Sequence, residues 1–201
     1  MTELAKHATR RDFLVIAGGA FAAVGSAAAL WPAIDSMNPD AAEWALANLE
    51  VDLAPIAEGQ AITVMWRRQP TFVRHRTKDE IAAATAAPVA GLLDRHAANA
   101  SLPEAAAARD DNRVKFGHEQ WLVVVGVCTH LGCVPRGQLK NDDRGAWGGW
   151  YCRCHGSQYD TSGRVRRGPA PKNLAVPKYY FINDTRILIG ADKPPGGAAT
   201  S

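Results

Sequence analysis

The chain of 201 residues carries 23 lysines and arginines against 20 aspartates and glutamates, so its formal net charge at pH 7 is only +3. This length allows one domain of ordinary size and an appendage. The weak charge, without any motif of a nucleic-acid-binding domain, argues against nucleic acid as a partner.

The N-terminus combines two arginines with an apolar run. Arg10 and Arg11 stand just before residues 13–31, which carry no charged side chain. Twin arginines mark bacterial export, and a helix of this length would rise about 28 Å, close to the roughly 30 Å core of a bilayer. The sequence therefore predicts a cytoplasmic N-terminus at 1–12 and a single transmembrane helix at 13–31.

The same run also fits a signal peptide that is cleaved after export. Alanines at 27–29 have the small-residue pattern of a cleavage site, and cleavage would release a soluble periplasmic protein. The length of the run and its ending at Trp31, an aromatic residue suited to the membrane interface, favour retention.

Residues 32–49 are predicted to form a flexible tether to a globular head at 50–190. Pro32 and Pro39 interrupt regular structure, and residues 41–47 favour a short helix. A tail rich in glycine, proline and alanine ends the chain and is predicted to be disordered. This tail spans residues 191–201.

Patterns in the head predict mostly β-structure. The alternation of Ile62, Val64 and Trp66 indicates a strand, and a turn at 69–70 leads into its partner at 71–76. Further strands are predicted at 121–127, 179–182 and 186–189.

Two segments of the head have a different pattern. Thr77 and Glu80 form a capping box that predicts a helix at 78–87, ended by Pro88. Residues 97–111 are rich in alanine and poor in large apolar side chains, so we expect a surface insert with partial helix.

All four cysteines lie in two short boxes, which read C-T-H-L-G-C at 128–133 and C-R-C-H-G-S at 152–157. Together the boxes supply two thiolates and two imidazoles, with two cysteines left over. Such mixed ligation suits a zinc site or a 2Fe–2S cluster in which two histidines replace two cysteines on one iron. Three other histidines have no ligand spacing and are predicted to be surface or structural: His75, His96 and His118.

The boxes resemble the Rieske iron–sulfur signature, C-T-H-L-G-C followed by C-P-C-H-G-S. With the twin arginines, the M-N-P at 37–39, the G-W at 149–150 and the G-P-A-P at 168–171, the chain resembles the Rieske subunits of bacterial cytochrome bc complexes, the ubiquinol–cytochrome c reductases. The resemblance implies a mainly β protein with a Rieske-type antiparallel head. It places an inserted cluster-binding subdomain at about 126–171.

The resemblance implies one Rieske-type 2Fe–2S cluster per subunit. Cys128 and Cys152 would bind one iron, and His130 and His155 the other. The resemblance also implies a disulfide that ties the two boxes together and needs an oxidising compartment. Its partners would be Cys133 and Cys154, for which two buried free thiols are the alternative.

Further roles follow from the same resemblance. Ser157 and Tyr159 would donate hydrogen bonds to a bridging sulfide and to the sulfur of Cys128, which tunes the reduction potential. Leu131 would form an apolar lid, and Gly132, like Gly156, would permit a tight loop whose N–H groups point at cluster sulfurs. The proline loop at 168–171 would cover the cluster.

In function, the resemblance implies an enzyme subunit that takes one electron and a proton from ubiquinol and passes the electron to cytochrome c1, contributing to proton translocation. His155 and His130 would be the catalytic side chains, with His155 facing the quinol. The expected partners are the cytochrome b and cytochrome c1 subunits, in a dimeric complex. The protein would cross the bacterial inner membrane once, with its head in the periplasm on a hinge at 32–49.

Three other classes remain as alternatives. A Rieske small subunit of a soluble periplasmic oxidase would fit the signal and the disulfide after cleavage, but not a retained anchor. A ferredoxin that feeds an oxygenase would lack the export signal. A zinc module would leave Ser157, Tyr159 and the proline loop without a role.

One residue departs from the signature: Arg153 stands where proline is usual. If its side chain pointed inward, this extra cation would raise the reduction potential or alter docking. The basic run of Arg164, Arg166 and Arg167 is predicted to be a solvated surface that helps to face acidic partners.

Overall fold

The computed structural model describes residues 9–37 and 47–192 and forms two compact units, residues 1–44 and 45–201. Half of the predicted tether, including all but the last residue of the expected helix at 41–47, and most of the predicted tail lie outside the described residues. The two units are taken in turn.

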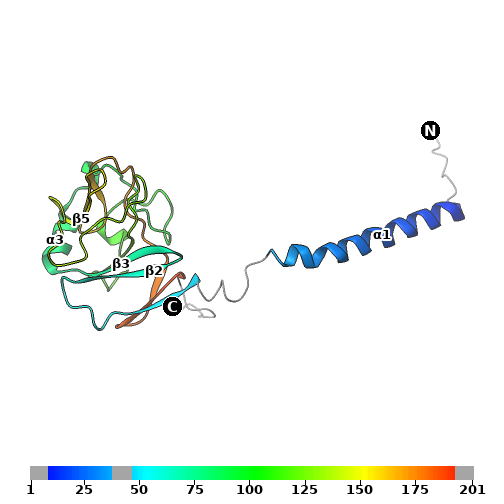
Figure 1. Cartoon of the computed structure of the whole chain (residues 1–201), viewed down its shortest axis with the longest axis horizontal. Helices are drawn as coiled ribbons and strands as arrows, with labels where there is room; N and C mark the ends of the chain where they lie inside the picture. The colour runs from blue at the N-terminus through cyan, green and yellow to red at the C-terminus, as the bar shows by residue number, and fades with distance from the viewer. Residues whose placement is uncertain (1–8, 38–46, 193–201) are drawn as a thin grey trace. The chain divides into compact units, whose positions relative to one another are not determined.

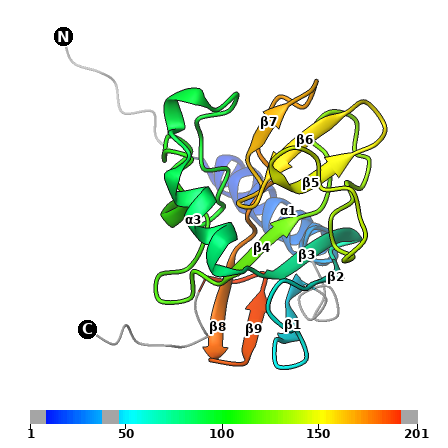
Figure 2. The same ribbon diagram turned by 90° about the vertical axis from the view of Figure 1, so that its left-hand side faces the viewer.

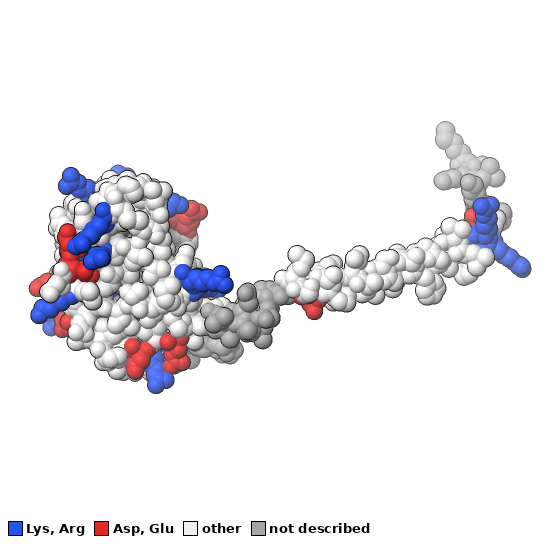
Figure 3. Space-filling view, viewed as in Figure 1, with Lys and Arg blue, Asp and Glu red and all other residues white. Residues whose placement is uncertain are grey.

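The first unit is the helix α1, Arg10–Asp35, drawn as one continuous helix in Figure 1. Thr9 and Asp12 close a capping box at its start. The helix is long and apolar enough to cross a membrane, and its charged side chains lie only near its ends (Figure 3).

The helix α1 is longer than the predicted span of 13–31, and the expectation that Pro32 ends regular structure is wrong. Pro32 lies inside the helix, whose C-cap is Ser36. Proline lacks an N–H and so removes one hydrogen bond. The carbonyl of Pro32 still accepts from the N–H of Ser36 at 2.9 Å, so the last turn closes past the proline.

The second unit, the head, contains three antiparallel sheets of three strands each within its described residues. The base sheet has the order β1-β9-β8, with β1 at Leu49–Asp52, β9 at Arg186–Ile189 and β8 at Tyr179–Asn183. The middle sheet joins β2 at Ala61–Trp66, β3 at Gln69–His75 and β4 at Trp121–Val125. The third sheet joins β5 at Gly148–Cys152, β6 at Ser157–Asp160 and β7 at Val165–Arg167.

The three sheets follow one another through the head. Figures 1 and 2 place the β5-β6-β7 sheet at one end of the head and the base sheet at the other, with β2-β3-β4 between them. The core runs through all three, and its buried rings include Phe72 of β3 stacked on Trp150 of β5 at 5.9 Å between ring centres. The predicted mainly β head with antiparallel pairing is confirmed.

The turn between β2 and β3 lies two residues earlier than predicted. Trp66 pairs with Gln69, so Arg67 and Arg68 form a two-residue turn, and Pro70 already belongs to β3. Both arginines have positive φ, 48° and 61°. Two-residue hairpins favour such turns because their twist matches that of the strands. Neither arginine signals this conformation in the sequence.

The helix α3, Lys78–Ala86, begins at the predicted capping box of Thr77 and Glu80. Two 3-10 turns follow it, η1 at Val89–Gly91 and η2 at Asp110–Asn112.

The expectation of a surface insert with partial helix at 97–111 is confirmed only in part, because seven of its fifteen residues are exposed and three are buried. Its only regular structure is the start of η2, and Ala97 and Ala108 are buried. The segment pairs through isolated bridges, including Asn99 with Val176. At Ala97 and Ala108 the small side chain lets the backbone pack closely against the rest of the head.

The expectation that Arg164 lies on the surface is also wrong. Arg164 is fully buried, where it binds Asp160 at 2.8 Å and the carbonyls of Ala108 and Ala84. These partners satisfy its charge and its donors. Of the predicted basic run, Arg167 is exposed and Arg166 is half-buried.

Candidate metal centre

The two boxes form two loops of the same design at the β5-β6-β7 end of the head. The first loop follows β4, and the second is the turn between β5 and β6. In each loop a glycine N–H closes back onto a cysteine carbonyl at 2.9 Å, from Gly132 to Cys128 and from Gly156 to Cys152. Both glycines have positive φ, +81° and +78°, which explains why glycine stands at these positions.

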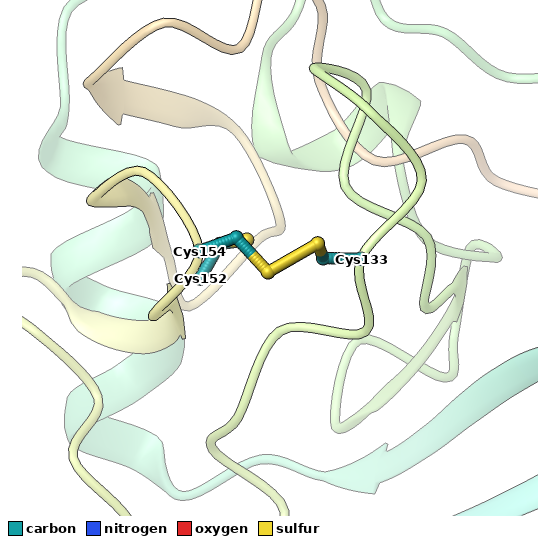
Figure 4. Close-up of side chains that lie close together, drawn as sticks. All are labelled: Cys133, Cys152 and Cys154. Atoms are coloured by element: carbon teal, nitrogen blue, oxygen red, sulfur yellow. A yellow bond between two sulfur atoms is a disulfide. The ribbon is translucent and has the colours of Figure 1, made fainter.

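A disulfide joins the two loops. Cys133 and Cys154 are bonded, with 6.8 Å between their Cα atoms, as Figure 4 shows with Cys152 beside them. The three sulfurs lie within 4.8 Å of one another, but sulfurs in a disulfide are not thiolate ligands. The implied disulfide is therefore present in the structure, and the alternative of two further free thiols is not.

The remaining two cysteines have the environment of ligands. Cys128 and Cys152 are free, and each is only 2% exposed. Burial alone would raise the pKa of the Cys128 thiol, but hydrogen bonds, above all from the Tyr159 hydroxyl and the His130 backbone N–H, lower it. The two thiols are thus buried close together, with donors that stabilise negative charge on Cys128.

The two box histidines lie side by side. The ring centres of His130 and His155 are 4.6 Å apart, and the rings are nearly perpendicular at 88°. His130 is half-buried and His155 is exposed. Two imidazoles and two buried thiols, carried on two loops that a disulfide joins, form the donor set that a histidine-ligated 2Fe–2S cluster needs, so the residues fit this group.

Tyr159 and Ser157 lie at the same centre. The Tyr159 hydroxyl donates to the sulfur of Cys128 at 3.2 Å. Burial and the sulfur acceptor raise the pKa of Tyr159, so it stays a donor. Ser157 is fully buried, and its Oγ accepts the N–H of Ala170 at 3.1 Å, which leaves its own O–H available to donate.

The G-P-A-P segment packs against the second loop. Gly168 has a φ of +101°, and a Cβ there would lie 2.5 Å from the Cα of Ser157, so the chain approaches too closely for any side chain. Beyond the prolines, the backbone of Lys172 exchanges two hydrogen bonds with the hydroxyl of Thr129, at 2.7 and 3.2 Å. The segment is thus bound to both loops.

Sequence reasoning missed two residues that support this arrangement. Thr129 stands inside the first box, so a hydroxyl between two ligand positions was a usable signal. Arg113 gave none. It is fully buried and donates to the carbonyls of Ser162 and Leu174, at 2.6 and 2.7 Å, and burial lowers its pKa to about 10. It fastens the β6–β7 turn to the segment that follows the prolines.

Leu131 and Arg153 both reach solvent. Leu131, which directly follows the ligand position His130, is 70% exposed, as expected of an apolar lid. Arg153 is exposed as well, so its side chain does not point inward, which was the condition for its predicted effect on the reduction potential.

Comparison with known families assigns the class. A model described as the Rieske [2Fe-2S] domain matches residues 101–179, which include most of the alanine-rich segment. The fold and the donor set define a Rieske protein, with a Rieske [2Fe–2S] cluster as its cofactor. A second model, described as the ubiquitinol-cytochrome C reductase Fe-S subunit TAT signal, matches residues 1–40.

Comparison with individual relatives identifies the family within the class of Rieske proteins. The ubiquinol-cytochrome c reductase iron-sulfur subunit of Bradyrhizobium diazoefficiens is 57% identical over 187 residues, covering 92% of this chain and 97% of the relative. That of Cereibacter sphaeroides is 44% identical, covering 94% and 100%. A chain of a solved hyperthermophilic respiratory Complex III matches with a TM-score of 0.50 and 25% identity, covering 86% and 98%. The chain belongs to the family of ubiquinol–cytochrome c reductase iron–sulfur subunits, and its N-terminal helix is the membrane anchor.

Proposed function

We propose that this chain carries electrons from ubiquinol to cytochrome c1 within a quinol–cytochrome c oxidoreductase. The observation that carries the proposal is the pair of disulfide-joined loops, with two buried thiols and two adjacent imidazoles. The high identity over nearly the whole length of named reductase subunits supports it.

The proposed ligands are Cys128 and Cys152 on one iron and His130 and His155 on the other. When bound, the cluster supplies a one-electron acceptor of high potential, because neutral imidazoles replace two anionic thiolates. Tyr159 stabilises added negative charge through its bond to the Cys128 sulfur, and the Ser157 hydroxyl also helps to lower the pKa of Cys128.

The histidines are proposed to handle the proton. His155 is exposed, so the ring nitrogen that does not bind iron is accessible to the hydroxyl of a quinol and can accept its proton. His130 is half-buried beside it and would be the second imidazole of this surface. Leu131, 70% exposed, offers an apolar contact that excludes water.

We place the anchor across the bacterial inner membrane once, with the head in the periplasm. The twin arginines and the apolar α1 support this orientation, and the Cys133–Cys154 disulfide fits an oxidising compartment. The proposed partners are cytochrome b, which would hold the quinol, and cytochrome c1, in a dimeric complex. Residues 32–49 would form the hinge between anchor and head.

The test is complementation of a deletion strain with wild-type or His155→Gln protein. Membranes with the wild-type protein should reduce cytochrome c with quinol, and His155→Gln membranes should not. Recovery of the mature protein in the soluble periplasm, cut after the alanines at 27–29, would instead favour the small subunit of a periplasmic oxidase.

A further inference from the structure

Basic side chains gather on the segments that form the metal centre. Residues 126–171 contain seven lysines and arginines but three acidic residues, whereas the rest of 50–190 contains twelve against eleven. The excess of positive charge in the head therefore belongs mostly to this one subdomain.

Many of these charges reach solvent. Five exposed basic residues on or next to this subdomain form what we call the basic collar, and none of them forms an ion pair with a described residue. They are Arg136, Lys140, Arg153, Arg167 and Lys172. Of the acidic residues of the subdomain, Asp160 is buried in ion pairs with arginines. The half-buried Asp142, whose pKa Arg136 helps to lower, and the exposed Asp143 offset the collar only in part.

Three members of the collar are held close to the two loops through the backbone. Arg136 exchanges two hydrogen bonds of 2.8 Å with Tyr151, the neighbour of Cys152. Lys172 is bonded through its backbone to Thr129, and Arg153 lies inside the second box. The same region exposes large apolar side chains, which are Leu131, Val134 and Leu139.

We propose that the basic collar docks onto an acidic surface that surrounds the redox centre of the electron-accepting cytochrome. This rests on the proposed function. An apolar centre with a charged rim is the usual anatomy of a protein interface, and complementary rim charges steer and orient a partner without holding it tightly. Such a rim suits a head that must dock and leave in every turnover.

A protein surface explains the collar better than anionic lipid does. An electron can leave only through a partner that contacts the two loops, and Arg153 stands within one of them. Because the Rieske signature has proline at this position, the extra cation of this chain predicts a matching acidic side chain on its own acceptor.

The test uses the complete complex with Arg153→Gln/Lys172→Gln, in which both backbone bonds of Lys172 can persist. The matched control is Arg68→Gln/Lys78→Gln, which removes two exposed charges from the β2–β3 turn and α3. The rate of cytochrome c1 haem reduction by quinol is measured without soluble cytochrome c, from about 20 to about 300 mM salt, a range over which screening grows strongly.

The wild type and the control should slow as salt rises. The collar variant should be roughly two- to tenfold slower at low salt, the size expected from two exposed charge pairs. It should also depend less on salt than the wild type and the control do, because three of the five collar charges remain. Identical salt dependence in all three proteins would overturn the proposal.

Two further measurements distinguish docking from other causes of a slower rate or of a salt effect. A redox titration of the variant should show an unchanged midpoint potential of the cluster. If the potential shifts enough to account for the slower rate, the substitutions act on the cluster and the docking proposal is overturned. A salt effect that appears only in bilayers with anionic lipid, and not in phosphatidylcholine nanodiscs, would assign the collar to the membrane. If quinol fails to reduce the haem in the wild type although the cluster is present, the proposed function fails rather than the collar.

Discussion

Tyr159 donates its hydroxyl to the sulfur of Cys128, and this bond should strengthen when the centre gains an electron. Tyr159→Phe should therefore lower the midpoint potential while leaving the ligands in place. A hydrogen bond to a charged group contributes about 1.5–3 kcal/mol, and about 1.4 kcal/mol corresponds to about 60 mV for one electron. Redox titration monitored by electron paramagnetic resonance measures the fall, expected to be tens of millivolts.

Tyr180→Phe is the control for Tyr159→Phe. Tyr180 is half-buried in β8 of the base sheet, so its hydroxyl should not affect the potential. Equal shifts in the two variants would remove Tyr159 from the set of tuning residues.

The buried Arg164 predicts a large difference between neighbouring arginines. Arg164→Leu leaves the buried Asp160 with Arg166, at 3.5 Å, as its remaining ion-pair partner among the described residues, and should destabilise the head by about 3–5 kcal/mol. Arg167→Leu, at an exposed position, should change stability little. Urea denaturation of the two proteins, followed by cluster absorbance, compares them, and equal midpoints would contradict the buried ion pair.

The residue types predicted the donor set of the cluster because cysteines and histidines at such short spacing have few roles other than metal binding. They did not predict the role of Arg164 or Arg113. Their burial depends on carbonyls far away in the chain, those of Ala84 and Ala108 for Arg164 and that of Leu174 for Arg113. A local pattern contains no information about such partners, so a run of arginines looks like a surface.

At the scale of elements, the disulfide between the two loops should be needed to retain the cluster. Cys133→Ser/Cys154→Ser opens a loop of 21 residues in sequence separation, for which the chain-entropy estimate is about 3 kcal/mol. We expect lower cluster content and a lower temperature of cluster loss, both measured by visible absorbance per protein. Normal content and thermal stability in the double variant would show that the hydrogen bonds of Thr129 and Ala170 suffice.

Five strands were predicted close to their true ends because alternation and apolar runs directly reflect which side chains face the core. The strands β1, β5, β6 and β7 were not predicted. The position of the β2–β3 turn and the packing of the alanine-rich segment were not predicted. A turn at Arg67 and Arg68 depends on strand register, which fixes the left-handed backbone even for arginine. The packing of Ala97 and Ala108 depends on distant segments that bury them.

At the scale of the whole molecule, the twin arginines should decide where the head is delivered. Arg10→Lys/Arg11→Lys keeps the charge and the apolar α1 but removes the arginine pair read at export. Protease added to spheroplasts should digest the head of the wild type and spare that of the variant. Arg67→Lys/Arg68→Lys is the matched control, and a variant head digested as readily as the control would contradict the export role.

The sequence was sufficient for the order of anchor and head, because an uncharged run and a cysteine-histidine signature are strong, separate signals. It was less reliable for the end of α1, where a proline is tolerated within the last turns. The basic collar could be identified only from the structure, because the sequence does not distinguish buried arginines from those exposed to solvent.

The most direct test of this account is electron paramagnetic resonance on membranes that contain the full chain, reduced first with ascorbate and then with dithionite. We expect ascorbate alone to give a signal whose average g value lies below that of the free electron, because histidine ligation produces a cluster of high potential. A signal that appears only with dithionite would mean a low-potential centre and would contradict the oxidation of quinol by this protein.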